Sequence, residues 1–178
     1  GDGGAVFTDD DALVQTLGSI RVHGKGSHKY DNDRIGINGR LDSIQAGVLL
    51  AKLGVFQDEI QSRQRVAGRY TDSLQTADRL QTPRVPEGST SAWAQYSVLA
   101  ADSRERQELQ SRLKEQGIPS VIYYPRPLHL QTAFKDLGYR EDDFPVSVDC
   151  ASRIFSLPMH PYLSAREQDR ICKVLRGD

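Results

Sequence analysis

Cysteine is scarce in this chain, with two among 178 residues. Cys150 and Cys172 lie far apart and form no Cys-x-x-Cys motif. A small disulfide-stabilised fold needs more cysteines than this, and so does a cysteine-rich zinc domain. We therefore expect two unreactive thiols in a reducing compartment, which places the protein in the cytoplasm.

An excess of either charge is also lacking, because 23 Lys and Arg stand against 24 Asp and Glu. Nucleic acids and anionic membranes attract surfaces of positive charge, and this balance offers none overall. No apolar run approaches the roughly 18 residues that a membrane span requires. The sequence therefore predicts no nucleic-acid partner and no membrane partner.

Metal-ligand spacing is absent as well. The four histidines, His23, His28, His129 and His160, include no pair at the i, i+4 helical spacing. We therefore expect no metal site.

The first residues do not look like a natural beginning. Gly1-Asp2-Gly3-Gly4 contains no initiator methionine and no charged or apolar segment typical of a signal peptide. We expect the sequence to be a piece of a longer chain.

The elements that are present alternate between strands and helices, as in an α/β fold. We expect strands at residues 5–7, 92–100 and 118–124. A capping box at Thr8 and Asp11 predicts a helix that opens there and ends near Gly24. Apolar residues at helical spacing predict one long helix or two from Asp42 to about Leu74, with a kink at Gly54, and a helix from Asp102 to Gly117. Further helices are expected over residues 130–134, 146–154 and 164–177, and a long polar loop over residues 25–39.

Two groups of polar residues stand out at the ends of these elements. Asn38 and Arg40 lie at a loop-to-helix junction, where an amide and a guanidinium can bind a phosphate or a carboxylate. A solvated turn explains that junction equally well. Tyr123, Tyr124 and Arg126 follow a predicted strand, a common position for binding residues in α/β proteins. A packing interface between strand and helix is the alternative there.

Several motifs resemble those of the DegT/DnrJ/EryC1/StrS sugar aminotransferases, and they occur in the order found in that family. They cover essentially the whole chain: Gly1-Asp2-Gly3-Gly4-Ala5-Val6-Phe7-Thr8, Arg21-Val22-His23-Gly24, Asn38-Gly39-Arg40-Leu41-Asp42-Ser43-Ile44-Gln45-Ala46, Ala94-Gln95-Tyr96, Gly117-Ile118-Pro119, Tyr124-Pro125-x-Pro127-Leu128 and Ser156-Leu157-Pro158-Met159-His160-Pro161.

The resemblance implies the C-terminal part of a fold-type I pyridoxal-phosphate-dependent transferase, an α/β fold. Residues 1–50 would end the large cofactor-binding domain and include a loop that crosses the dimer. Residues 51–178 would form a long connecting helix and the small C-terminal α/β domain. The family works as homodimers with shared active sites.

The resemblance also implies the site residues and the chemistry. The cofactor-binding lysine is expected just upstream of Gly1, so this segment alone would contain no catalytic residue. Asn38 would bind the phosphate of pyridoxal 5'-phosphate in the neighbouring subunit, and Arg40, Tyr123 and Tyr124 would bind the substrate. The reaction implied is an amino transfer from glutamate to a keto carbon of a nucleotide-linked sugar.

Within the family, residues 34–45 and 156–163 look most like the enzymes that act on UDP-2-acetamido-2-deoxy-3-oxo-glucuronate in O-antigen and lipopolysaccharide synthesis. A guanidinium such as that of Arg40 matches the substrate's carboxylate. Tyr123 departs from the histidine of that group, although a phenol can still hydrogen-bond to the uridine or stack on it. Two alternatives remain open: a 4-keto nucleotide-sugar aminotransferase, and a non-catalytic α/β dimerisation or binding module.

Overall fold

The computed structural model describes residues 3–28, 30–75, 77 and 79–177. Its contacts divide the chain into two units, Gly1–Phe56 and Gln57–Asp178. Helix α2 (Ser43–Leu74) contains the boundary between the units, so its beginning belongs to the first and its end to the second. No helix in the described part is both long enough and apolar enough to span a membrane.

The first unit contains α1 (Asp11–Arg21), a loop and the beginning of α2. Helix α1 is capped by Asp10, whose Oδ1 accepts hydrogen bonds from the amides of Ala12 and Leu13, and not by Thr8 as predicted. The strand predicted at residues 5–7 is wrong, because this stretch is irregular and Phe7 is 92% exposed. A strand needs a neighbouring strand to satisfy its backbone groups, and residues 3–28 and 30–56 contain no strand.

Helix α2 is a single helix of 32 residues. Its buried residues all lie in the second half: Val66, Ala67, Tyr70 and Leu74. In its first half, apolar side chains such as Ile44 and Leu53 are exposed. The predicted apolar stripe therefore packs only where α2 meets the second unit's own core.

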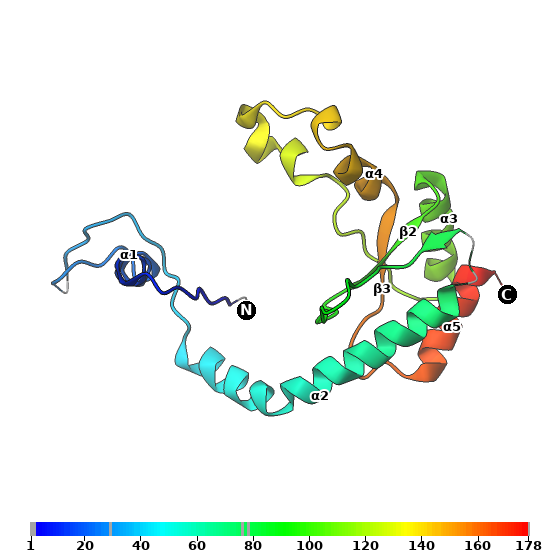
Figure 1. The fold of residues 1–178 in the computed structure, drawn as a ribbon, viewed down its shortest axis with the longest axis horizontal. Coiled ribbons are helices and arrows are strands. Elements are labelled where there is room, and N and C mark those ends of the chain that lie inside the picture. Colours follow the sequence, from blue (N-terminus) through cyan, green and yellow to red (C-terminus); the bar gives the residue numbers. More distant parts are fainter. Residues whose placement is uncertain (1–2, 29, 76, 78, 178) are drawn as a thin grey trace. The chain divides into compact units, whose positions relative to one another are not determined.

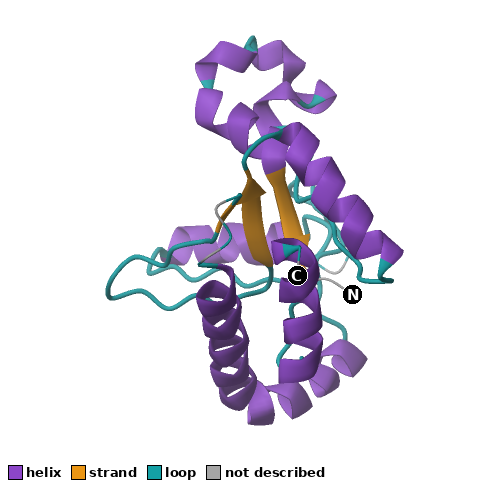
Figure 2. Cartoon of the chain, turned by 90° about the vertical axis from the view of Figure 1, so that its right-hand side faces the viewer, coloured by secondary structure: helices purple, strands orange, loops and turns teal. Residues whose placement is uncertain are grey.

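The second unit is built on a three-stranded antiparallel sheet in the order β1-β2-β3. The strands are β1 (Leu80–Gln81), β2 (Tyr96–Ala100) and β3 (Ile154–Leu157). Tyr96 pairs with Leu157 and Val98 with Phe155. Figure 2 shows β2 and β3 side by side among helices. This combination of helices and sheet confirms the α/β prediction.

The remaining elements connect and cover the sheet. They are α3 (Ser103–Glu115), the short 3-10 helices η1 (Leu128–Leu130), η2 (Thr132–Leu137) and η3 (Glu141–Asp143), α4 (Pro145–Arg153) and α5 (Ala165–Arg176). In Figure 1, α3 and α5 lie next to each other near the C-terminus. The strand predicted at residues 118–124 is reduced to one bridge, between Val121 and Ser156. Pro119 and Pro125 lack the amide that a longer ladder requires.

Two tyrosines fix the end of α2 to the sheet. The Tyr70 hydroxyl donates to the Pro158 carbonyl at 3.0 Å, and the Tyr96 hydroxyl lies 2.8 Å from Thr71 Oγ1. Burial raises the pKa of Tyr96 to about 12 and raises the pKa of Tyr70 as well. Burial also raises the pKa of Cys172, so its thiol is less reactive, as the sequence predicts.

Local end signals agree with the sequence at both ends of α3 and α5. Asp102 Oδ1 accepts from the Glu105 amide at 2.8 Å, and Ser164 and Glu167 form a reciprocal capping box. The hydrogen bonds from Ser164 lower the pKa of the Glu167 carboxyl group. Gly117 and Gly177 take left-handed conformations after these helices.

Candidate functional site

The first candidate site begins where α1 ends. His23 and Gly24 have φ angles of 61° and 75°, so the chain turns sharply after the helix. The Gly24 amide donates to the Ser19 carbonyl at 2.8 Å. Gly24 thus occupies the left-handed position that the sequence predicts for it.

The loop that follows folds back against this turn through two glycines. A Cβ atom on Gly24 would lie well inside 3.0 Å of the Arg34 carbonyl, and one on Gly36 equally close to the Gly24 amide. Asn32 Nδ2 also donates to the His23 carbonyl at 2.6 Å. The described residues of the loop are therefore held against the turn by the Asn32 side chain and by close backbone approaches that only glycine permits.

We expect Gly24→Ala to lower the free energy of unfolding of the full polypeptide by more than about 1 kcal/mol, because alanine meets both a positive φ and a backbone clash. Urea denaturation measures this change. Gly18→Ala is the matched control: Gly18 lies in α1 with open space around it, and the same substitution should stabilise the helix by about 0.5–1 kcal/mol. Equal effects of the two substitutions would contradict the packing described for Gly24.

Past the glycines, residues 37–39 run antiparallel to the end of α1. The Ile37 amide donates to the Ile20 carbonyl at 2.8 Å, the His23 amide to the Ile37 carbonyl at 2.9 Å, and the Gly39 amide to the Arg21 carbonyl at 2.8 Å. These bonds flank Asn38, which forms a bridge with Val22. The backbone of Asn38 is thus held firmly while its side chain stays exposed.

Arg40 sets the orientation of the Asn38 amide. Arg40 Nε donates to Asn38 Oδ1 at 3.0 Å, which identifies the oxygen and leaves the two Nδ2 hydrogens pointing elsewhere. No partner for Nδ2 is found among the described residues. Asn38 and Arg40 thus form a joint group of uncharged and charged donors, suited to an anion such as a phosphate or a carboxylate.

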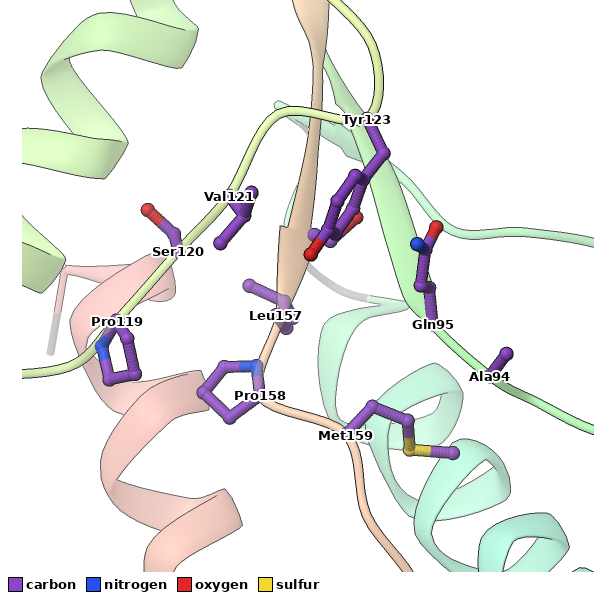
Figure 3. A pocket seen from close by; sticks show the side chains of 10 residues that line it. Ala94, Gln95, Pro119, Ser120, Val121, Tyr123, Leu157, Pro158 and Met159 are labelled. Atoms are coloured by element: carbon purple, nitrogen blue, oxygen red, sulfur yellow. The ribbon is translucent and has the colours of Figure 1, made fainter. Parts of the chain in front are cut away.

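The second candidate site contains Tyr123 and Tyr124, whose rings meet edge to face with centroids 5.6 Å apart. Tyr123 lines a cavity of about 190 Å³ together with Gln95 and Met159, and Figure 3 shows these side chains around it. Tyr123 also lines, with Tyr124 and Arg126, a larger cavity of about 430 Å³. The two predicted tyrosines therefore lie next to each other, Tyr123 lining both cavities and Tyr124 the larger one.

These side chains are suited to binding and orienting a ligand. The two cavities are lined mainly by aromatic and aliphatic groups, with Arg126 as a cation. Among the residues that the structure describes, no lysine and no histidine lines either cavity. Asn38 and Arg40 belong to the first unit and the tyrosines to the second, so each pair is described within its own unit.

Sequence reasoning missed the close approach of Gly24 and Gly36, and it missed Gln95 as a cavity residue. Two glycines at the ends of a polar loop are a signal for the first. Gln95 stands in the Ala94-Gln95-Tyr96 motif of the resemblance, but the motif gives it no role, and the sequence does not show that Gln95 and Tyr123 line one cavity.

Comparison with known proteins gives consistent matches over the whole chain. The sequence profile of the DegT/DnrJ/EryC1/StrS aminotransferase family matches residues 1–176. The chain is 41% identical over 98% of its length to a UDP-2-acetamido-2-deoxy-3-oxo-D-glucuronate aminotransferase from Pseudomonas aeruginosa, of which it covers 46%. It is 36% identical over 99% of its length to a UDP-N-acetyl-3-dehydro-alpha-D-glucosamine 3-aminotransferase from Acidithiobacillus ferrooxidans, again covering 46%.

The fold comparison agrees with the sequence comparison. A crystal structure of a DegT/DnrJ/EryC1/StrS aminotransferase from Brucella abortus superposes with a TM-score of 0.83 at 51% identity, covering 96% of this chain and 44% of that one. The chain therefore spans about half the length of the relatives that it matches.

Proposed function

The chain belongs to the DegT/DnrJ/EryC1/StrS aminotransferase family, and from this premise we propose that the intact polypeptide is a pyridoxal-phosphate-dependent aminotransferase. Its amino donor is glutamate, and its acceptor is a UDP-linked 3-keto sugar. The observation that carries the proposal is the Asn38–Arg40 pair, two anion-binding side chains held by the folded-back loop.

The residues at this junction fit the phosphate end of the cofactor. The Asn38 amide offers two uncharged hydrogens, and its orientation is set by Arg40, so it can donate to a dianion without reorganising. When bound, pyridoxal phosphate carries the amino group between the donor and the acceptor. Asn38 would hold the phosphate for the neighbouring subunit of a homodimer, while the Schiff-base lysine is expected upstream of Gly1.

The remaining site residues are assigned to the substrate. Arg40 would bind a carboxylate of the sugar, because its terminal nitrogens stay available when Nε is bonded to Asn38. Tyr123 and Tyr124 would contact the UDP-sugar at the rim of the 430 Å³ cavity. The P. aeruginosa relative is named for a 3-oxo-glucuronate, which supports an acidic 3-keto sugar as the acceptor.

The wider assignments follow from the same proposal. Residues 1–50 would end the large domain and carry the loop that crosses the dimer, and residues 51–178 would contain the connecting helix and the small domain. Such an enzyme would act in the cytoplasm, in the synthesis of an O-antigen or another lipopolysaccharide sugar.

A half-reaction with the full polypeptide tests the proposed function. The protein is loaded with pyridoxamine phosphate, candidate keto-sugars are added singly, and the absorbance of the pyridoxal form is followed. We expect the absorbance to return with UDP-2-acetamido-2-deoxy-3-oxo-glucuronate. If the pyridoxal absorbance returns only with a 4-keto sugar, the acceptor is the alternative 4-keto substrate. If it returns with no sugar, the non-catalytic binding module is the remaining hypothesis.

A further inference from the structure

One histidine of the second unit has a buried nitrogen that makes no hydrogen bond. His129 Nε2 is shielded from solvent, and no partner for it is found within residues 79–177 or elsewhere in the described chain. A buried polar atom in a folded protein is normally satisfied, so an unpaired one calls for an explanation. A ligand that reaches Nε2 would supply the missing partner.

The surroundings of His129 form a mainly apolar cavity of about 350 Å³. We call it the His129 pocket, and its lining includes Leu128, His129, Phe134, Tyr139, Phe144 and Ser147. The imidazole and the Phe144 ring have centroids 4.7 Å apart, and the Tyr139 and Phe144 rings 5.1 Å apart. Aromatic faces around one polar atom are typical of a site for a planar ring that carries hydrogen-bonding groups.

The His129 pocket adjoins the 430 Å³ cavity of the second candidate site, which we call the Arg126 pocket. Leu128 and Ser147 line both cavities, so they share a wall. In the described part of the chain, the Arg126 guanidinium has no ion pair and no hydrogen bond. It is therefore available to an anion that occupies its pocket.

We propose that the two adjoining pockets bind the nucleoside diphosphate part of the substrate, with the base in the His129 pocket and the diphosphate at Arg126. The inference deepens the proposed function by locating the nucleotide of the nucleotide sugar. A uracil ring stacks against Phe144 and Tyr139, and one of its polar groups bonds to His129 Nε2. The imidazole serves as donor or acceptor according to its tautomer, so it can pair with a ring carbonyl or with a ring N–H.

Two features favour this ligand class over others. A purely apolar ligand would leave His129 Nε2 unpaired, and an isolated phosphate would gain nothing from the aromatic lining. A metal ion lacks a ligand set there, because no cluster of three or more metal-ligating side chains occurs in the part of the chain that the structure describes. A nucleoside diphosphate uses both pockets.

Binding of UDP and of inorganic pyrophosphate to the full-length holoenzyme, measured by calorimetry, tests the inference. We expect His129→Phe to weaken UDP binding about tenfold, about 1.4 kcal/mol, and to leave pyrophosphate binding unchanged. Arg126→Gln should weaken both ligands. Lys135→Gln is the control, because it removes a charge from the neighbouring exposed helix η2 without touching either pocket, and it should change neither affinity.

Phe144→Leu provides a second variant in case His129→Phe does not fold, since it keeps the pocket apolar and removes the stacking face; it too should weaken UDP selectively. Unchanged UDP affinity in the folded variant, or an equal loss of UDP and pyrophosphate binding, would overturn the inference.

Failure of this inference is distinguishable from failure of the proposed function. If the wild-type holoenzyme aminates UDP-keto sugars while His129→Phe and Phe144→Leu bind UDP normally, only the proposed base site is wrong. If the variants change UDP binding as expected but the wild-type holoenzyme aminates no keto-sugar, only the proposed reaction is wrong.

Discussion

Asn38→Ala in the full-length polypeptide is expected to weaken pyridoxal phosphate binding about ten- to hundredfold, if the proposed function holds. The reason is the loss of a hydrogen bond to a charged group, which contributes about 1.5–3 kcal/mol, where 1.4 kcal/mol is a factor of ten. The structure gives this residue a fixed backbone and an amide oriented by Arg40. Equilibrium dialysis against the cofactor measures the change.

Two further variants separate the amide of Asn38 from the order of the loop. Asn38→Asp should be more damaging than Asn38→Ala, because it places a negative charge where the phosphate would lie. Asn32→Ala removes the bond to the His23 carbonyl and loosens the loop while keeping the Asn38 amide. If Asn32→Ala releases the cofactor as readily as Asn38→Ala, the loop and not the amide is responsible.

Arg40→Ala is expected to lower kcat/KM for the acidic 3-keto sugar about 100-fold and to change kcat/KM for the neutral 3-keto sugar far less. A guanidinium pairs with a carboxylate through two parallel bonds, and this contact is lost only for the acid. The comparison is made at saturating pyridoxal phosphate, because Arg40 also orients Asn38.

Arg40→Lys is the matched variant, since it keeps the charge and loses the planar pair of donors. It should recover part of the activity with the acid and leave the neutral sugar unaffected. If Arg40→Ala loses activity equally with both sugars, Arg40 does not bind the carboxylate of the acidic sugar.

Local signals made much of the fold predictable. The Asp102–Glu105 cap, the Ser164–Glu167 box and the glycines after the helices are encoded within a few residues, so sequence alone locates these ends. The predictions of strands at residues 5–7 and 118–124 are wrong because strand formation is not decided locally. A strand depends on neighbours elsewhere in the chain, and local β propensity says nothing about them.

The site shows the same division between local and distant effects. Asn38 and Arg40 are two residues apart, so their placement at a loop-to-helix junction could be predicted, whereas their mutual hydrogen bond could not. The sequence offers His129 only as a candidate metal ligand, because it cannot show that the imidazole nitrogen is buried among aromatic rings. Such surroundings arise only when the short helices between residues 128 and 143 pack beside Phe144 and α4.

A mixed dimer tests most directly whether this segment completes the active site of a partner subunit. Tagged wild-type and untagged Asn38→Ala full-length subunits are combined, the heterodimer is purified, and bound pyridoxal phosphate is counted per dimer at a concentration that fills only wild-type sites. We expect pyridoxal phosphate to be lost from one of the two sites. The retained cofactor should be bound to the lysine of the Asn38→Ala subunit, because the wild-type Asn38 completes that site. Retention at both sites, loss at both, or retention on the wild-type subunit's own lysine would contradict the assignment.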